Sequence, residues 1–167
     1  MHKKIKLATI YMQTIIKSPV QIVFDLSRSI DLHKISTAKT NEQAIAGITT
    51  GLIQLNETVT WRAKHLGKYR LFTSKITAYH APYFFKDEMQ KGDFKKFSHL
   101  HTFTQHKGYT LLTDHITLEA PFGLIGKLVM SIFLKNYITK FISNRNNLIK
   151  NFAETDQWKL ILQHEQQ

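Results

Sequence analysis

The sequence predicts an α+β fold in which a curled antiparallel sheet of about seven strands surrounds one long C-terminal helix. Three observations support it. A strand and two short helical segments open the chain, hydrophobicity of period two follows over 43–118, and an amphipathic helix pattern closes it. An antiparallel sheet must cover its apolar face, and only the terminal helix is long enough to do so. We expect a single domain over 1–167, because this length suits one hydrophobic core.

The opening segments are each marked by a local signal. Apolar side chains alternate over 10–16, which predicts a strand. Ser18 and Pro19 are typical of a helix start, because a hydroxyl can cap the helix and proline suits its first position. A second short helix is expected over 29–34.

Glycines divide the middle of the chain into further strands. Gly67, Gly92 and Gly108 lie in short gaps that suit antiparallel hairpins. After the Pro-Phe-Gly segment at 121–123, a helix pattern runs over 124–154. The expected strands cover 43–54 (broken near its glycines), 58–65, 69–79, 83–89, 94–106 and 109–118.

In these segments the sequence resembles the START-like (SRPBCC) superfamily, whose small bacterial members have a helix-grip fold. The resemblance implies binding of hydrophobic small molecules and no metal. The superfamily also contains carriers, cyclases and dehydratases, so the fold alone does not decide the function. The segments that carry the resemblance are PVQIVFDL at 19–26, ETVTW at 57–61, PYFFKDEM at 82–89, FSHLHTF at 97–103, TLLTD at 110–114, PFG at 121–123, and Arg145.

Strand parity places four polar side chains on the apolar inward face: Asp87, His99, His101 and Asp114. The simplest interpretation is a ladder of hydrogen-bonded polar groups within the sheet. The same groups could anchor a ligand. Alternatively, a histidine oriented by a carboxylate could act as a general base.

The hairpin turn decides which histidine faces Asp114. A turn at residues 106–107 puts His99 opposite the carboxylate, whereas a turn at 107–108 puts His101 there. In both registers an imidazole is the cross-strand neighbour of Asp114.

The spacing His99-x-His101 is also that of a metal-binding pair. Asp114, Asp87 or His65 could supply a third ligand to zinc or iron. No motif determines this third ligand, so we expect no metal and no cofactor.

Arg145 places a charge on the apolar stripe of the C-terminal helix, between Phe141 and Leu148. A buried charge is costly unless it is paired. The guanidinium could pair with an inward carboxylate, hold an anionic ligand, or extend outward to solvent.

These observations predict a protein that binds or carries a lipid, an isoprenoid or a polycyclic aromatic compound between sheet and helix. The alternative is a cyclase or dehydratase with His99 or His101 as acid and base and Asp114 as the orienting group; we lean towards no enzymatic activity. The expected ligand contacts are Trp61, Phe72, Phe85, Asp87, Met89, Phe97, His99, His101, Phe103, Asp114, Ile116 and Arg145.

Charge and cysteine content limit the partners. The chain carries a net charge of +11 and no cysteine. The charge could give weak attraction to anionic surfaces, but no nucleic-acid-binding motif is present and we expect no nucleic-acid partner. The longest apolar run is too short and too charged to span a membrane, so we expect a cytoplasmic protein. We expect it to be a monomer or a dimer.

Overall fold

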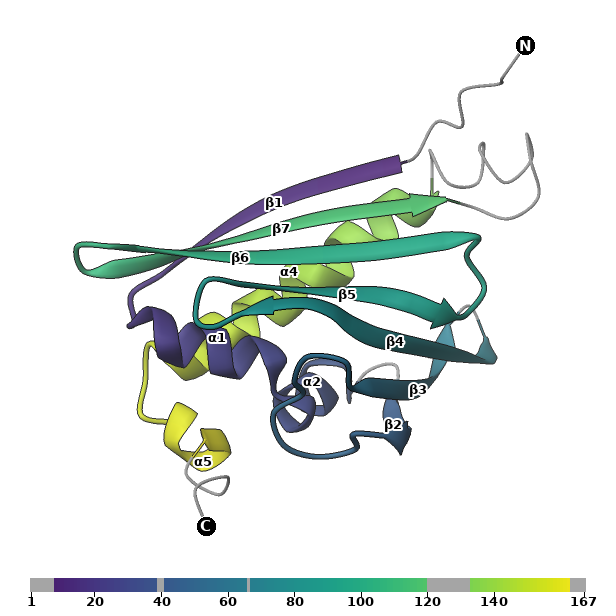
Figure 1. Cartoon of the computed structure of the whole chain (residues 1–167), viewed down its shortest axis with the longest axis horizontal. Coiled ribbons are helices and arrows are strands. Elements are labelled where there is room, and N and C mark those ends of the chain that lie inside the picture. The colour runs from purple at the N-terminus through teal and green to yellow at the C-terminus, as the bar shows by residue number, and fades with distance from the viewer. Residues whose placement is uncertain (1–7, 39–40, 66, 120–132, 163–167) are drawn as a thin grey trace.

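The computed structural model describes residues 8–38, 41–65, 67–119 and 133–162. It is an α+β structure with seven antiparallel strands in one curled, open sheet, as predicted (Figure 1). The strands follow one another in the order β1-β7-β6-β5-β4-β3-β2. The elements are β1 (Ala8–Ile16), α1 (Val20–Arg28), α2 (Ile30–Ser36), β2 (Gln43–Gly47), β3 (Thr58–His65), β4 (Lys68–His80), β5 (Phe84–Lys91), β6 (Lys96–His106), β7 (Tyr109–Glu119), α4 (Lys135–Ala153) and α5 (Trp158–Leu162).

Helix α4 lies along the inner side of the sheet and contacts α1, α2 and β1 (Figure 1). The first part of the expected helix over 124–154 lies outside the described residues, and the rest is confirmed as α4. The short helix α5, which packs against α1, was not predicted.

The two short helices begin differently. Ser29 caps α2 as a serine should, because its side chain accepts a hydrogen bond from the Leu32 backbone N–H at 3.2 Å. The expected capping of α1 by Ser18 is wrong: Pro19 is the N-cap residue and no side-chain cap comes from it. Instead, the Val20 N–H donates to Oε1 of Gln105 in β6 at 2.7 Å.

Strand β2 is shorter than the expected strand over 43–54 and ends at Gly47. Gly47 has a φ of +74°, and a Cβ there would lie 2.1 Å from the backbone oxygen of Thr58. Only glycine allows both the left-handed backbone and this close approach, so the strand ends where the glycine turns the chain.

The buried face of α4 differs from the expected stripe. Phe141 and Leu148 are only half-buried, whereas Ile142 and Ile149 are buried. The face is therefore rotated by about one residue toward these isoleucines. As a result, two adjacent polar residues of α4, Arg145 and Asn146, both face the interior.

Candidate functional site

A pocket with a volume of about 800 Å³ lies between the inner face of the sheet and the helices. Its walls are mostly apolar and aromatic side chains from β3, β4, β5, β6 and α4. The residues predicted to contact a ligand that line this pocket are Trp61, Phe72, Phe85, Asp87, Phe97, His99, His101 and Arg145.

Four other predicted contacts do not line the pocket: Met89, Phe103, Asp114 and Ile116. Phe103 packs edge-on against Phe24, and Ile116 is wholly buried in the core next to β1. Parity correctly puts Phe103, Asp114 and Ile116 on the inward, buried face, although they do not line the cavity.

The inward histidines and aspartates form one cluster on β5, β6 and β7. The β6–β7 turn lies at residues 107–108, so His101 is the cross-strand partner of Asp114. In the register of β5 with β6, His99 is the cross-strand partner of Asp87. Side chains also connect diagonally, because His99 Nε2 lies 2.8 Å from Asp114 Oδ1. Each histidine is therefore placed between the two carboxylates.

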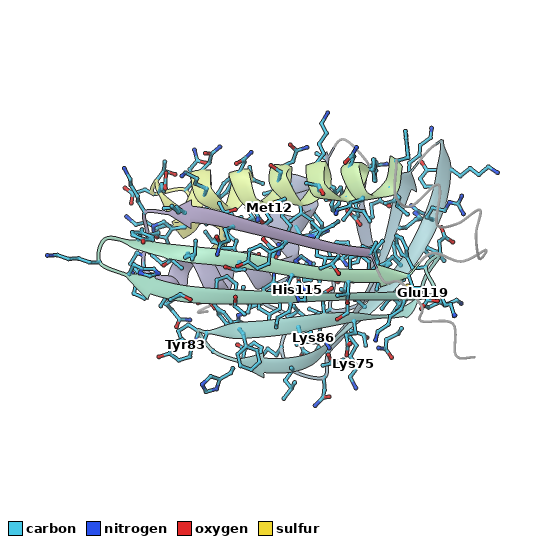
Figure 2. All side chains as sticks on the ribbon, turned by 90° about the horizontal axis from the view of Figure 1, so that it is seen from above. Met12, Lys75, Tyr83, Lys86, His115 and Glu119 are labelled. Carbon is cyan, nitrogen blue, oxygen red and sulfur yellow. The ribbon has the colours of Figure 1, made fainter. Side chains whose placement is uncertain are left out.

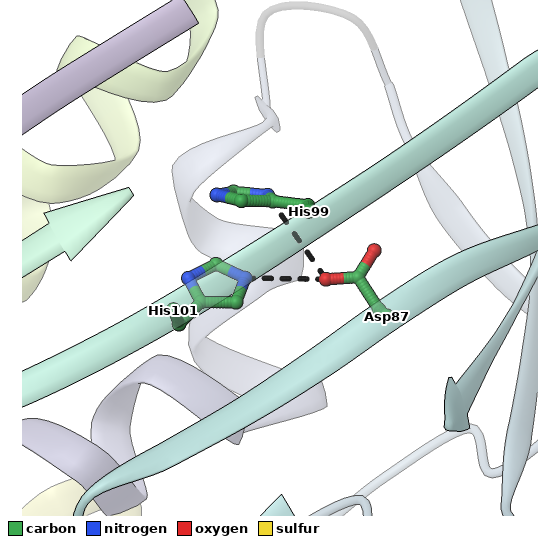
Figure 3. Close-up of side chains that lie close together, drawn as sticks. All are labelled: Asp87, His99 and His101. Atoms are coloured by element: carbon green, nitrogen blue, oxygen red, sulfur yellow. Dashed lines mark hydrogen bonds and ion pairs between the residues drawn. The ribbon is translucent and has the colours of Figure 1, made fainter. Parts of the chain in front are cut away.

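The contacts on the pocket side of the cluster are longer. His101 Nε2 lies 3.2 Å from Asp87 Oδ2, and His99 Nδ1 lies 4.0 Å from the same oxygen (Figure 3). On the other side, His101 Nδ1 lies 3.0 Å from Asp114 Oδ1, but the geometry of this contact does not make a hydrogen bond. The centroids of the two imidazole rings are 3.7 Å apart, and the ring planes are tilted by 36°.

Helix α4 holds the deepest carboxylate in place. Asn146 Nδ2 donates to Asp114 Oδ2 at 2.6 Å and also contacts Thr14 of β1 at 3.2 Å. The Asp114 side chain has no solvent exposure. A buried acid with partners from two directions is rigid and well suited to orienting the histidines.

The surroundings of the cluster favour a charged Asp114 and a neutral His99. Burial raises the pKa of Asp114, but the close contact with His101 and the hydrogen bond from His99 outweigh it and hold that pKa well below its usual value. Burial also raises the pKa of Asp87, but the hydrogen bond from His101 and the nearby charges outweigh it, so that pKa is lowered. Burial is the main cause that lowers the pKa of His99, with a contribution from the charge of His101. A neutral His99 has one N–H, and its short contact to Asp114 places that proton on Nε2.

Arg145 points inward and is 8% exposed, so the predicted alternative in which it extends outward to solvent is wrong. The prediction that Arg145 pairs directly with a protein carboxylate is wrong, because among the described residues no carboxylate oxygen lies within ion-pair distance of its guanidinium. Nη2 donates instead to the backbone oxygen of Ser27 at the end of α1, and Nη1 has no hydrogen-bond partner. Burial lowers the pKa of Arg145, while the charges of Asp114 and Asp87 act in the opposite direction.

Sequence reasoning missed Asn146 and Ser27. Asn146 lies four residues after Ile142 and three before Ile149, so helical spacing could have placed its amide on the buried face. Ser27 contributes only its backbone oxygen, for which a side-chain pattern gives no signal.

The predicted basic residues of the β3–β4 hairpin do not all lie on one face. Arg62 is exposed on the outer face, whereas Arg70, although exposed, lines the pocket and pairs there with Asp93 at 3.1 Å. Within the described part of the chain, no helix is long and apolar enough to cross a membrane. The side chain of His65, one suggested metal ligand, lies outside the described residues.

Comparisons with known proteins agree on the fold. No protein-family model matches the sequence, and no curated protein does. A START superfamily protein from Mycobacterium smegmatis superposes with a TM-score of 0.66 at 11% identity, over 87% of this chain and 97% of that one. Major latex-like protein 151 from Panax ginseng gives 0.66 at 15% identity, over 89% and 99%.

A third solved structure, a protein from Chromobacterium violaceum, gives a TM-score of 0.68 at 9% identity and covers 89% of this chain and 99% of that one. These identities are too low to transfer a function, but the coverage extends over almost the whole of each chain. The chain therefore has the START-like helix-grip fold that its sequence motifs imply.

Proposed function

We propose that this protein binds or carries an apolar small molecule, such as a lipid, an isoprenoid or a polycyclic aromatic compound, in the pocket between sheet and helix. The observation that carries the proposal is the pocket itself. Its volume of about 800 Å³ lies within the range of known ligand sites, and apolar and aromatic side chains make up most of its wall. The occurrence of this fold in START and latex-like proteins supports the same function.

The polar groups at the pocket wall suggest how such a ligand would be oriented. Arg145 lines the pocket and has one guanidinium nitrogen without a hydrogen-bond partner. An acidic or carbonyl group on an otherwise apolar ligand would supply an acceptor to this nitrogen. We therefore propose an amphipathic ligand with one oxygen-bearing end.

The experiment measures thermal unfolding with fatty acids, isoprenoids and polycyclic aromatics, together with the alcohol that matches each acid. A ligand specific for the native state adds about 2.7 kcal/mol at a hundredfold excess over its dissociation constant. We expect saturable stabilisation, larger for the acid than for its alcohol. No stabilisation by any compound of such a panel would contradict ligand binding, and equal effects of acid and alcohol would contradict the role of Arg145.

Two variants of β4 separate pocket binding from surface adsorption. Phe72 lines the pocket, whereas Tyr69 on the same strand is exposed and does not. Phe72→Ala should reduce the ligand-induced stabilisation, and Tyr69→Ala should leave it unchanged. Native mass spectrometry of protein purified from its own cells would identify a ligand that copurifies.

The second candidate is an enzyme of the cyclase or dehydratase kind. The specific observation in its favour is the hydrogen bond from His99 to Asp114, which leaves His99 Nδ1 as a base at the pocket wall. His99→Gln should then abolish turnover while apolar ligands still bind. Binding without turnover in the wild-type protein would favour the carrier.

Location and assembly stay predictions. We propose a cytoplasmic monomer or dimer, and the exposed arginines and lysines of β3 and β4 support at most weak, salt-sensitive attraction to anionic surfaces.

A further inference from the structure

We propose that Asp87, His99 and His101 form a binding site for one divalent transition-metal ion, such as Zn²⁺ or Fe²⁺, at the wall of the pocket. One ligand atom from each of the three residues lies within 4.8 Å of the other two, and Asp87 Oδ2 lies 3.2 Å from His101 Nε2 and 4.0 Å from His99 Nδ1 (Figure 3). The proposal does not depend on the apolar ligand. The proposal reverses the expectation that the protein binds no metal. The sequence pattern indicated the histidine pair but did not determine a third ligand.

The arrangement of protons is the first argument. His99 lies 2.8 Å from Asp114 through Nε2 but 4.0 Å from Asp87 through Nδ1, so its N–H belongs to the contact with Asp114. The lone pair of Nδ1 therefore faces the carboxylate of Asp87, which also offers only lone pairs. A cation between these two acceptors would remove the repulsion between them.

His101 provides the second argument. Its Nδ1 lies 3.0 Å from Asp114 Oδ1 yet has no hydrogen-bond partner, although His101 is only 2% exposed. When a metal ion takes Nε2, the ring proton that now faces Asp87 moves to Nδ1, and a small rotation of the ring then lets Asp114 Oδ1, 3.0 Å away, accept it. The ring stays neutral, no proton is lost, and the buried nitrogen gains a partner.

Asp114 then plays a defined part as the carboxylate behind both ligands. Metal-binding histidines almost always donate their other ring N–H to a carboxylate or carbonyl group, which fixes the tautomer and the ring orientation. Here one oxygen of Asp114 faces both histidines, and Asn146 holds its other oxygen at 2.6 Å. For His99 this support exists without the metal, so its donor atom Nδ1 is already oriented.

The donor set and its exposure indicate the class of ion. Two imidazoles and one carboxylate suit zinc and iron, and three protein ligands leave a coordination position open. Asp87, His99 and His101 all line the pocket, so that position would face it. The two negative charges of Asp87 and Asp114 also outnumber the single positive charge of Arg145 nearby.

The test uses untagged full-length protein, stripped with a chelator and titrated with Co²⁺ followed by visible absorption, and with Zn²⁺ in competition. We expect one ion per chain, visible bands typical of nitrogen ligation and a higher melting temperature. Asp87→Asn and His99→Gln should weaken binding more than Asp114→Asn, for which we expect a loss of about 10–100-fold.

His115→Gln is the matched control, because His115 lies on the exposed outer face of β7. It should bind Co²⁺ and Zn²⁺ like the wild type. The proposal is overturned if the wild-type protein takes up no stoichiometric ion, or if Asp87→Asn binds unchanged. If His99→Gln fails to fold, Asp87→Asn decides alone, since the side chain of Asp87 is 19% exposed at the edge of the cluster.

Discussion

Strands β5 to β7 carry polar and charged residues on both faces, and the two faces hold them in different ways. On the outer face, Lys86 pairs with Glu88 at 2.8 Å and His115 is exposed (Figure 2). On the inner face, Asp114 and His99 are buried and depend on each other. Solvent stabilises the outer charges, whereas inner charges need protein partners. The inner cluster therefore depends on its protein partners, and the outer charges do not.

The largest expected effect comes from removing one inner charge. Asp114→Asn should lower the free energy of unfolding by about 3–5 kcal/mol, because it removes one partner of a buried charged network. The matched outer change is Glu119→Gln, which breaks a pair with the exposed Lys95 at 2.7 Å and should cost less than about 1 kcal/mol. Urea denaturation of metal-free protein measures both. Equal losses would show that the two faces do not differ in this way.

A smaller effect is expected for Arg145→Met. The guanidinium donates to the Ser27 backbone oxygen but makes no direct ion pair within the described residues, so its loss should cost about 1.5–3 kcal/mol, as for a hydrogen bond to a charged group. Chemical denaturation checks this value. A change close to zero would mean that Arg145 reaches solvent in solution.

The smallest effect concerns pH. Burial lowers the pKa of His99, so the unfolded chain binds a proton more readily, and stability should fall as the pH drops from 7 to 5. The lowered pKa of Asp114 acts in the same direction at more acidic pH, where its stabilisation is lost. In metal-free protein, His99→Gln should flatten the first decline by at most about 1.4 kcal/mol per pH unit.

His115→Gln provides the comparison from the outer face, and its stability should follow the pH dependence of the wild type. A similar flattening in both variants would assign the pH dependence to histidines in general. Denaturation curves at several pH values between 5 and 7 distinguish these results.

Much of the cluster could be predicted from local pattern. The period-two alternation of β6 put His99 and His101 on the face of Phe97 and Phe103, and that of β7 put Asp114 on the same side. Which histidine would face the carboxylate depended on the turn, and Gly108, with a φ of +83°, places the turn at 107–108. In the structure this choice matters little, because both rings reach Asp114.

The sequence by itself determined the succession of strands and helices from β1 to α4 and the inward position of Asp87, His99, His101 and Asp114, because side-chain alternation and helical spacing are local properties of the chain. Tertiary structure decided what lies opposite each of these residues. Gln105 binds the start of α1 from 85 residues away, and Asn146 reaches Asp114 from α4. Asp87 became the third member of the histidine cluster because β5 pairs with β6 in one register. Such contacts depend on the packing of distant segments, which a local pattern does not specify.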